Sequence, residues 1–128
     1  MKDLKHLIYF EDLLQEANND LVKQAKADGK YAIGYTCYFM PEVLLDLPGC
    51  FSVRLRAPRC TSPDIATYYM SSRVCHYARS LLERALEGGF NFLDAQMATE
   101  TCTGTCRFQE HLQQKHLDSV KDMRIIDN

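Results

Sequence analysis

The amino terminus lacks the long apolar run that a signal peptide or a membrane-spanning helix requires. Its first residues, MKDLKHLIYFEDLLQEANND, carry charged side chains every few positions. We therefore expect a cytoplasmic protein with no membrane as a partner. In such a reducing compartment, cysteines serve as metal ligands, redox groups or buried thiols more often than in disulfides.

The sequence also lacks an excess of positive charge. It has 15 Lys and Arg against 17 Asp and Glu, a net charge of −2. Because binding to nucleic acid requires many basic side chains to neutralise phosphates, nucleic acid is excluded as the main partner. The local exception is Arg54, Arg56 and Arg59, which could meet a phosphate-bearing ligand such as coenzyme A or form a solvated face.

Extremes of composition are missing as well. The 128 residues are 46% hydrophobic and 25% charged, with six glycines and four prolines. These values exclude a collagen, a coiled coil and a disordered chain, and the sequence has no internal repeat. A chain of this length fits a single domain with a core of its own.

Hydrophobic periodicity predicts helices and strands in alternation, with boundaries at glycine, proline and serine. The predicted helices span 4–25, 42–47, a segment from Ser62 or Ser71 to the residue before Gly88, and 107–120, and the predicted strands span 31–37, 51–55, 90–95 and 123–126.

This alternation predicts an α/β fold, a mostly parallel sheet of about four strands with helices on both faces. The arrangement is that of half of a Rossmann-like domain. Because the fourth strand has barely begun at Asn128, we expect residues 1–128 to be a single amino-terminal α/β domain of a longer, truncated subunit.

Cysteines follow several predicted strands, and ligands of open α/β sheets gather beyond the carboxyl ends of the strands. Cys37 ends the first strand, Cys60 follows the second, and Cys102 and Cys106 follow the third, while Cys75 lies near a helix start. We therefore expect several thiols to converge on one edge of the sheet.

Two of these cysteines are candidate metal ligands. A helix amino terminus stabilises a thiolate, which favours Cys75 as a ligand for a soft metal, although a buried structural thiol is the alternative. Cys102 lies in the polar stretch TETCTGTC, where a core position is not expected. Zinc binding by Cys102, Cys106, His111 and His116 is disfavoured, because histidines five residues apart on a helix diverge by roughly 140°.

Two other residues are candidates near this edge. Glu42 follows Pro41 at a helix start, where its carboxylate could stabilise the helix end or act as a base. Asp94 ends the predicted third strand.

Three stretches together resemble the family of benzoyl-CoA reductase and 2-hydroxyglutaryl-CoA dehydratase D-component subunits, the 2-hydroxyacyl-CoA dehydratases. They are GYTCYFMPEVLL (34–45), RLRAPRCTSPDIATYYMSSRVCHYARSLLERALEGGFNFLDA (54–95) and TETCTGTCRFQEHL (99–112). The resemblance implies that Cys75 and Cys102 are metal ligands of a [4Fe-4S] cluster whose third ligand lies outside this chain. The family tends to have an aspartate after the second ligand, where this chain has Thr103.

The function implied by the resemblance is that of an iron-sulfur subunit in anaerobic metabolism. Such a subunit takes a low-potential electron from an ATP-dependent activator protein and passes it to a coenzyme A thioester, for radical dehydration by a lyase or ring reduction by an oxidoreductase. Its other partner is a related or identical subunit. Glu42 would then be a catalytic residue and Arg54 a coenzyme A-binding residue, and we do not expect this chain to be active alone.

The sequence leaves a different class of function open. A non-catalytic metal-binding or subunit-assembly module could keep the same α/β half-domain, with the first helix supplying an apolar stripe for assembly.

Overall fold

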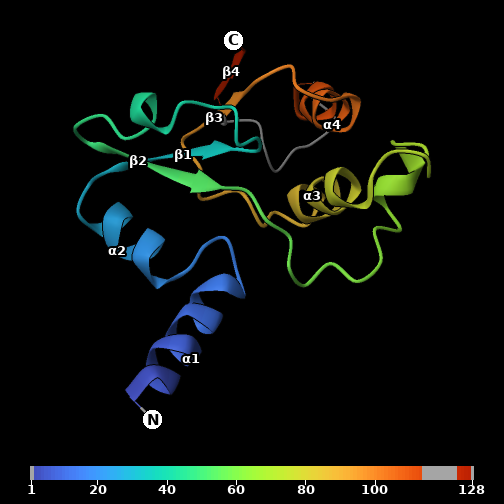
Figure 1. The fold of residues 1–128 in the computed structure, drawn as a ribbon. Coiled ribbons are helices and arrows are strands. Elements are labelled where there is room, and N and C mark those ends of the chain that lie inside the picture. The colour runs from blue at the N-terminus through green and yellow to red at the C-terminus, as the bar shows by residue number, and fades with distance from the viewer. Residues whose placement is uncertain (1, 114–123, 128) are drawn as a thin grey trace.

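The computed structural model describes residues 2–113 and 124–127 of the chain (Figure 1). Helices and strands alternate along it. The α-helices are α1 (Lys2–Leu14), α2 (Asp20–Ala27), α3 (His76–Leu86) and α4 (Thr103–Gln113), the short 3₁₀ helices are η1 (Glu42–Leu44) and η2 (Ala66–Tyr68), and the strands are β1 (Tyr31–Tyr35), β2 (Cys50–Arg54), β3 (Ala95–Ala98) and β4 (Arg124–Asp127).

The strands pair in the order β2-β1-β3-β4, and every pair is parallel. In the register of β1 with its two neighbours, Gly34 lies opposite Val53 of β2 and Gln96 of β3. The predicted α/β class with a parallel sheet is therefore confirmed. Because all the strands run the same way, their carboxyl ends lie along one edge of the sheet.

The predicted helices differ from the structure in two places. The single helix expected over 4–25 is two helices, because the Asn19 side chain accepts a 3.1 Å hydrogen bond from the N–H of Val22 and so begins α2. The helix expected at 42–47 is only the 3₁₀ helix η1. Residues 114–120 of the last predicted helix lie outside the described residues.

The third strand was predicted five residues too early. Residues 90–93 form turns, in which the N–H of Leu93 bonds the carbonyl of Phe90, and β3 begins at Ala95. Phe90 and Leu93 are buried nevertheless, at 2% and 6% exposure. These apolar residues are buried within a turn. A short apolar run in the sequence does not show whether it forms a buried turn or a buried strand.

The expectation of helices on both faces of the sheet is wrong for the described residues. Ala32 and Val53 point into the main core, which also holds the buried apolar side chains of α2, α3 and α4. On the other face of β1, Tyr35 packs with Met40 and Leu45, which flank or follow η1. Loop and 3₁₀ helix thus cover the face where further α-helices were predicted.

An ion pair between Lys26 and Asp94 holds helix α2 against the sheet. Lys26 Nζ lies 3.0 Å from Asp94 Oδ2 and 2.6 Å from the carbonyl of Phe92. The same carboxylate oxygen accepts the N–H of Ala32 at 2.8 Å. Asp94 therefore precedes β3, at the amino end of the sheet, and not on the ligand edge where it was expected.

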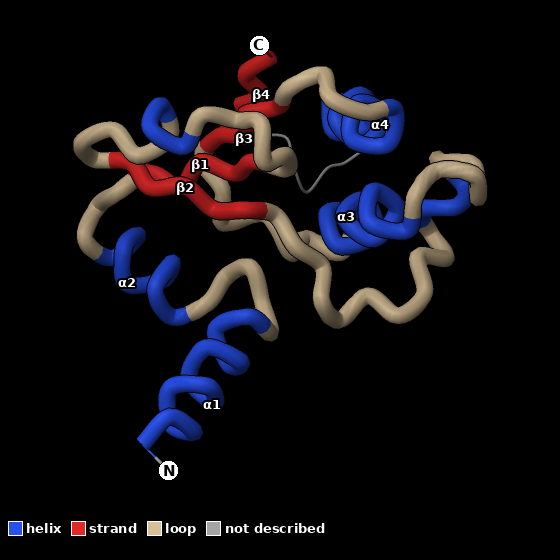
Figure 2. Tube along the Cα trace, viewed as in Figure 1, coloured by secondary structure: helices blue, strands red, loops and turns tan. Residues whose placement is uncertain are grey.

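Helix α1 extends away from the sheet, with the amino terminus at its far end (Figure 2). Its apolar side chains are about half exposed, including Leu4, Leu7, Ile8, Phe10 and Leu14. Among the described helices, none combines the length and the apolar character needed to cross a membrane.

Candidate thiol site at the carboxyl edge of the sheet

Three cysteines lie beyond the carboxyl ends of β1 and β3. Cys37 is the second residue after β1, Cys102 immediately precedes α4, and Cys75 immediately precedes α3. Cys75 and Cys102 are exposed, and Cys37 is half-buried. Exposure of Cys75 and Cys102 argues against the alternative that they are structural core thiols, because free cysteines without a function are usually buried.

The first turns of α3 and α4 meet at Cys75. A Cβ added to Gly104, in the first turn of α4, would lie 3.0 Å from Cys75 Sγ and 3.3 Å from Ala78 Cβ. Cys75 is itself the amino-terminal cap residue of α3. Its sulfur therefore lies between the first turns of the two helices.

Cys102 caps the other helix, since its carbonyl accepts the N–H of Cys106 at 3.1 Å. The Thr105 hydroxyl lies 3.2 Å from Cys102 Sγ. This hydroxyl, followed by the N–H groups of Thr105 and Gly104, lowers the pKa of the Cys102 thiol. The local structure thus stabilises Cys102 as a thiolate, the form of cysteine that binds metals.

Cys37 is the third thiol of this edge. The Thr101 hydroxyl and then the N–H of Phe39 lower the pKa of the Cys37 thiol by hydrogen bonding. A negative charge on Cys37 in turn raises the pKa of Cys102, so the two sulfurs interact electrostatically. The loop that joins β3 to α4 therefore brings Cys102 towards the end of β1.

Tyr77 joins helix α3 to the sheet. Its hydroxyl donates to the carbonyl of Leu55 at 3.0 Å and to that of Thr36 at 3.3 Å. Burial raises the pKa of Tyr77, and the nearby Arg54 cation opposes that rise. Because Tyr77 is two residues after Cys75, these bonds hold the start of α3 against the ends of β1 and β2.

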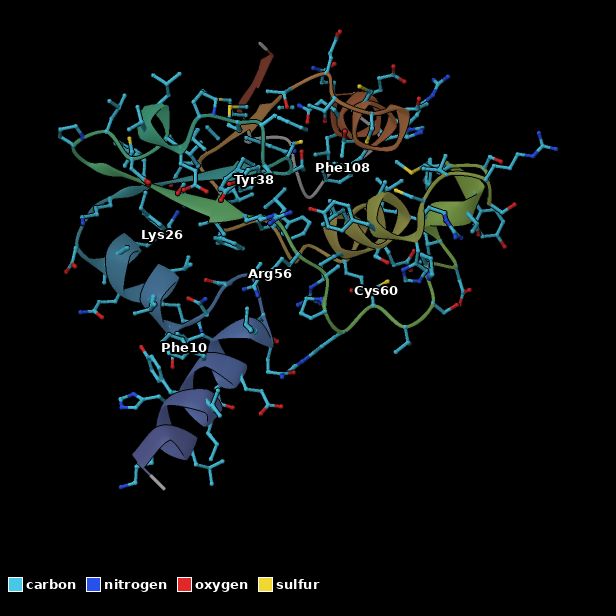
Figure 3. The ribbon with its side chains drawn as sticks, in the orientation of Figure 1. Phe10, Lys26, Tyr38, Arg56, Cys60 and Phe108 are labelled. Atoms are coloured by element: carbon cyan, nitrogen blue, oxygen red, sulfur yellow. The ribbon has the colours of Figure 1, made fainter. Side chains whose placement is uncertain are left out.

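The three arginines of the predicted phosphate cluster are separated in the structure. Arg56 donates hydrogen bonds of 3.4 Å to the carbonyls of Leu13 and Leu14. Arg59 forms an ion pair with Glu16 at 2.9 Å. Figure 3 shows Arg56 between the sheet and the α1 end of the chain. Arg54 is exposed at the carboxyl end of β2, beside Tyr77.

Glu42 lies on η1, on the face of the sheet that Tyr35 occupies. Its Oε1 accepts a 2.9 Å hydrogen bond from the Tyr35 hydroxyl, and η1 has no side-chain cap. Burial, followed by this bond to Glu42, raises the pKa of Tyr35. Glu42 thus lies in the first turn of η1, as the helix-end alternative expects, and its exposed carboxylate also accepts the bond from the Tyr35 hydroxyl.

Two other cysteines, Cys50 and Cys60, do not join this group. Cys50 begins β2 and so lies at the amino end of the strands. In Figure 3, Cys60 and Phe108 of α4 lie on opposite sides of α3. Across residues 2–113, no three His, Cys, Asp or Glu side chains are gathered closely enough to hold a metal ion. Cys102, Cys106 and His111 thus form no zinc site in the described part of the chain, and His116 lies outside it.

Residues 37–127 match the family described as 2-hydroxyglutaryl-CoA dehydratase, D-component. The chain belongs to this family. A curated relative, the (R)-phenyllactyl-CoA dehydratase beta subunit of Clostridium sporogenes, is 27% identical over 93 residues, which are 73% of this chain and 25% of the relative. The chain therefore spans about a quarter of the length of that dehydratase subunit. The D-component resemblance seen in the three sequence stretches is confirmed.

The sequence alone did not reveal the roles of Tyr77 and Gly104 at the carboxyl edge of the sheet. Both act across the contact between a helix and a neighbouring element, so the periodicity of their own helix does not reveal them. The available signal was their position in the first turn of a helix that follows a cysteine.

Proposed function

We propose that this chain is part of a 2-hydroxyacyl-CoA dehydratase subunit whose carboxyl edge binds an iron-sulfur cluster through Cys75 and Cys102. The single observation that supports this most is that the sulfur of the exposed Cys75, at the start of α3, lies against the first turn of α4, the helix that the exposed Cys102 precedes. Thiolates are the protein ligands of such clusters, and helix amino termini favour negative charge.

The residues present suit part of a [4Fe-4S] site. Cys75 and Cys102 supply two thiolate donors, and the third is expected outside this chain. Bound there, the cluster would supply one low-potential electron at a time to a coenzyme A thioester, replenished by an ATP-dependent activator. A related or identical subunit is the second protein partner in this proposal.

The chain's own polar groups would then handle the substrate. Arg54, exposed at the same edge, would bind a phosphate or carboxylate of the coenzyme A thioester. Glu42 would accept or return a proton at its carboxylate, because the Tyr35 hydroxyl orients one oxygen and leaves the group open to solvent.

The experiment is iron analysis of the complete anaerobic complex. Cys75→Ser and Cys102→Ser should each lower the iron content and the low-temperature electron paramagnetic resonance signal of the reduced cluster. Cys50→Ser and Cys60→Ser are matched controls and should leave both unchanged. Full iron content and an unaltered signal in the Cys75 and Cys102 variants would contradict the proposal.

The same complex decides between dehydration and ring reduction. The family description and the named relative favour dehydration, so a 2-hydroxyacyl-CoA should lose water, whereas benzoyl-CoA should not be reduced. Reduction of benzoyl-CoA would place the chain with the reductases instead.

A second candidate function is subunit assembly without catalysis, which the exposed apolar side chains of α1 favour. Replacing Leu7 and Phe10 with serine should then weaken co-purification with the partner subunit and leave the folded chain intact. Under this alternative, the Cys75→Ser and Cys102→Ser variants would change neither iron content nor assembly.

A further inference from the structure

Glycine at position 104 has no conformational explanation. The glycines with a positive φ angle in the described chain are Gly29, Gly49 and Gly88, whereas Gly104 lies within α4. A glycine inside a helix is less favourable than alanine, because it loses more backbone freedom on folding. The reason for glycine must therefore lie in what surrounds this position.

The surroundings are crowded on the side that faces α3. A Cβ at position 104 would meet Cys75 Sγ at 3.0 Å, Ala78 Cβ at 3.3 Å and Val74 Cγ1 at 3.7 Å. The first of these distances is shorter than normal van der Waals contact, so an added side chain would require its nearest neighbour to shift by a few tenths of an ångström. That neighbour is the candidate ligand sulfur.

We propose that Gly104 is a positioning residue, whose missing side chain lets the Cys75 sulfur lie against the first turn of α4, beside Cys102. This proposal rests on the proposed function, in which Cys75 and Cys102 bind one soft metal centre. Gly104 itself touches no ligand and acts only through the position of Cys75.

The way in which the crowding would be relieved follows from the exposure of each neighbour. Ala78 is fully buried and its Cβ is fixed to the helix backbone, so it can move little. Cys75 is exposed, and its sulfur can rotate about the Cα–Cβ bond into solvent. Gly104→Ala should therefore turn the sulfur away from Cys102 and leave the fold intact.

The test uses Cd²⁺ alone as the probe, added to the reduced full-length chain without oxygen. Absorption from sulfur-to-cadmium charge transfer reports binding, and Cys75→Ser and Cys102→Ser identify the part that needs both thiols. Gly104→Ala should weaken that binding by about 10-fold or more, the usual loss when the support of a ligand is removed. Gly89→Ala is the control, since the three nearest atoms to its Cβ would all belong to the flexible Arg84 side chain.

A second variant separates steric conflict at the sulfur from damage to the fold. In a Cys75→Ala background, adding Gly104→Ala should lower the melting temperature less than it does in the wild type, because the nearest atom in conflict is gone and only the 3.3 Å contact with Ala78 remains. In the wild-type background, Gly104→Ala should lower the melting temperature by a larger amount. An equal effect of Gly104→Ala in both backgrounds would show that Cys75 is not the residue affected.

Cadmium binding by Gly104→Ala as tight as that of the wild type would overturn the proposal, and so would cadmium binding by the wild type that does not need Cys75. Failure of the proposed function gives a different result. The wild-type chain would pair its two thiols on cadmium, with Gly104→Ala weakening that binding, while the native complex contained no iron.

Discussion

The Tyr77 hydroxyl donates a 3.0 Å hydrogen bond to the Leu55 carbonyl, which joins the first turn of α3 to the segment that follows β2. The same hydroxyl also reaches the Thr36 carbonyl after β1. One phenol thus connects the ends of two strands to the helix that begins at Cys75. This connection gives the thiol edge a fixed support that does not depend on a bound ligand.

Tyr77→Phe should remove this support without emptying the space that the ring fills. We expect the free energy of unfolding to fall by about 1–2 kcal/mol, because two carbonyls lose a donor. The measurement is chemical denaturation, together with thiol-dependent cadmium binding, which should also weaken. Tyr68→Phe is the control, since the Tyr68 side chain is 89% exposed, and a loss of the same size there would contradict the assignment.

The Asp94 carboxylate should contribute more to stability than its partner Lys26. Asp94→Ala removes the ion pair and also leaves the backbone N–H of Ala32 without its acceptor, whereas Lys26→Met removes the cation and its hydrogen bond to the carbonyl of Phe92. We expect a loss of about 2 kcal/mol for Asp94→Ala and about 1 kcal/mol or less for Lys26→Met, because the pair is partly exposed.

Thermal or urea unfolding checks the order of these two effects. The exposed pair of Lys23 with Asp20 is the control, and Lys23→Met should change stability by only about 0.5 kcal/mol or less. Equal losses for Asp94→Ala and Lys26→Met would contradict the larger contribution assigned to Asp94.

The thiols of Cys37 and Cys102 should react at lower pH than ordinary cysteine. Their pKa values are lowered from the usual 9.0 by hydrogen bonds that favour the thiolate. Alkylation of each, followed by mass spectrometry of the labelled peptides, should therefore reach half its maximal rate at a lower pH than in the urea-unfolded chain. Thr105→Val should return the Cys102 profile towards that of the unfolded chain and leave Cys37 nearly unchanged.

The same shifts make stability depend on pH. A thiol whose pKa is lower in the folded state adds stability that is fully present above the unfolded value of 9.0 and is lost as the pH falls through the folded value. The free energy of unfolding should therefore rise through this alkaline window, less so in Cys102→Ser. A flat profile that the substitution does not change would contradict the lowered pKa.

The class of the fold was predictable because hydrophobic periodicity reflects which residues are buried, and the period of burial differs between helices and strands. The prediction failed where burial and strand formation separate, as at Phe90 and Leu93, which are buried in turns. It also failed at Asn19, where one capping side chain divides an otherwise continuous helical pattern.

The candidate site was only partly predictable for a similar reason. Placing Cys37 and Cys102 after parallel strands needs only the topology, which the alternation of elements supplies. The roles of Tyr77 and Gly104 depend on how closely α3 approaches the sheet and α4, and this spacing is set by side chains far apart in the sequence. The separation of Arg56 and Arg59 from Arg54 depends on the linker before α2 in the same way.

The bond between Tyr35 and Glu42 should make the phenol titrate above its ordinary value of 10.0, with burial as the larger cause and Glu42 as the smaller. Glu42→Gln keeps an oxygen that can accept the bond but removes the negative charge. The pKa of Tyr35 should therefore fall part of the way towards 10.0 and stay above it, because the ring is still buried. Nuclear magnetic resonance of labelled tyrosine rings follows this titration, with the exposed Tyr31 as the internal reference.

The sign of the accompanying stability change follows from the raised pKa. A phenol that holds its proton more tightly in the folded state stabilises the fold fully below the unfolded value, and this stability is lost as the pH rises through the folded value. Wild-type protein should therefore lose stability above pH 10.0, and Glu42→Gln should lose less over the same range. If Glu42→Gln left the Tyr35 titration unchanged, the carboxylate would not be coupled to the phenol, and its proposed role as a proton acceptor would lose its structural support.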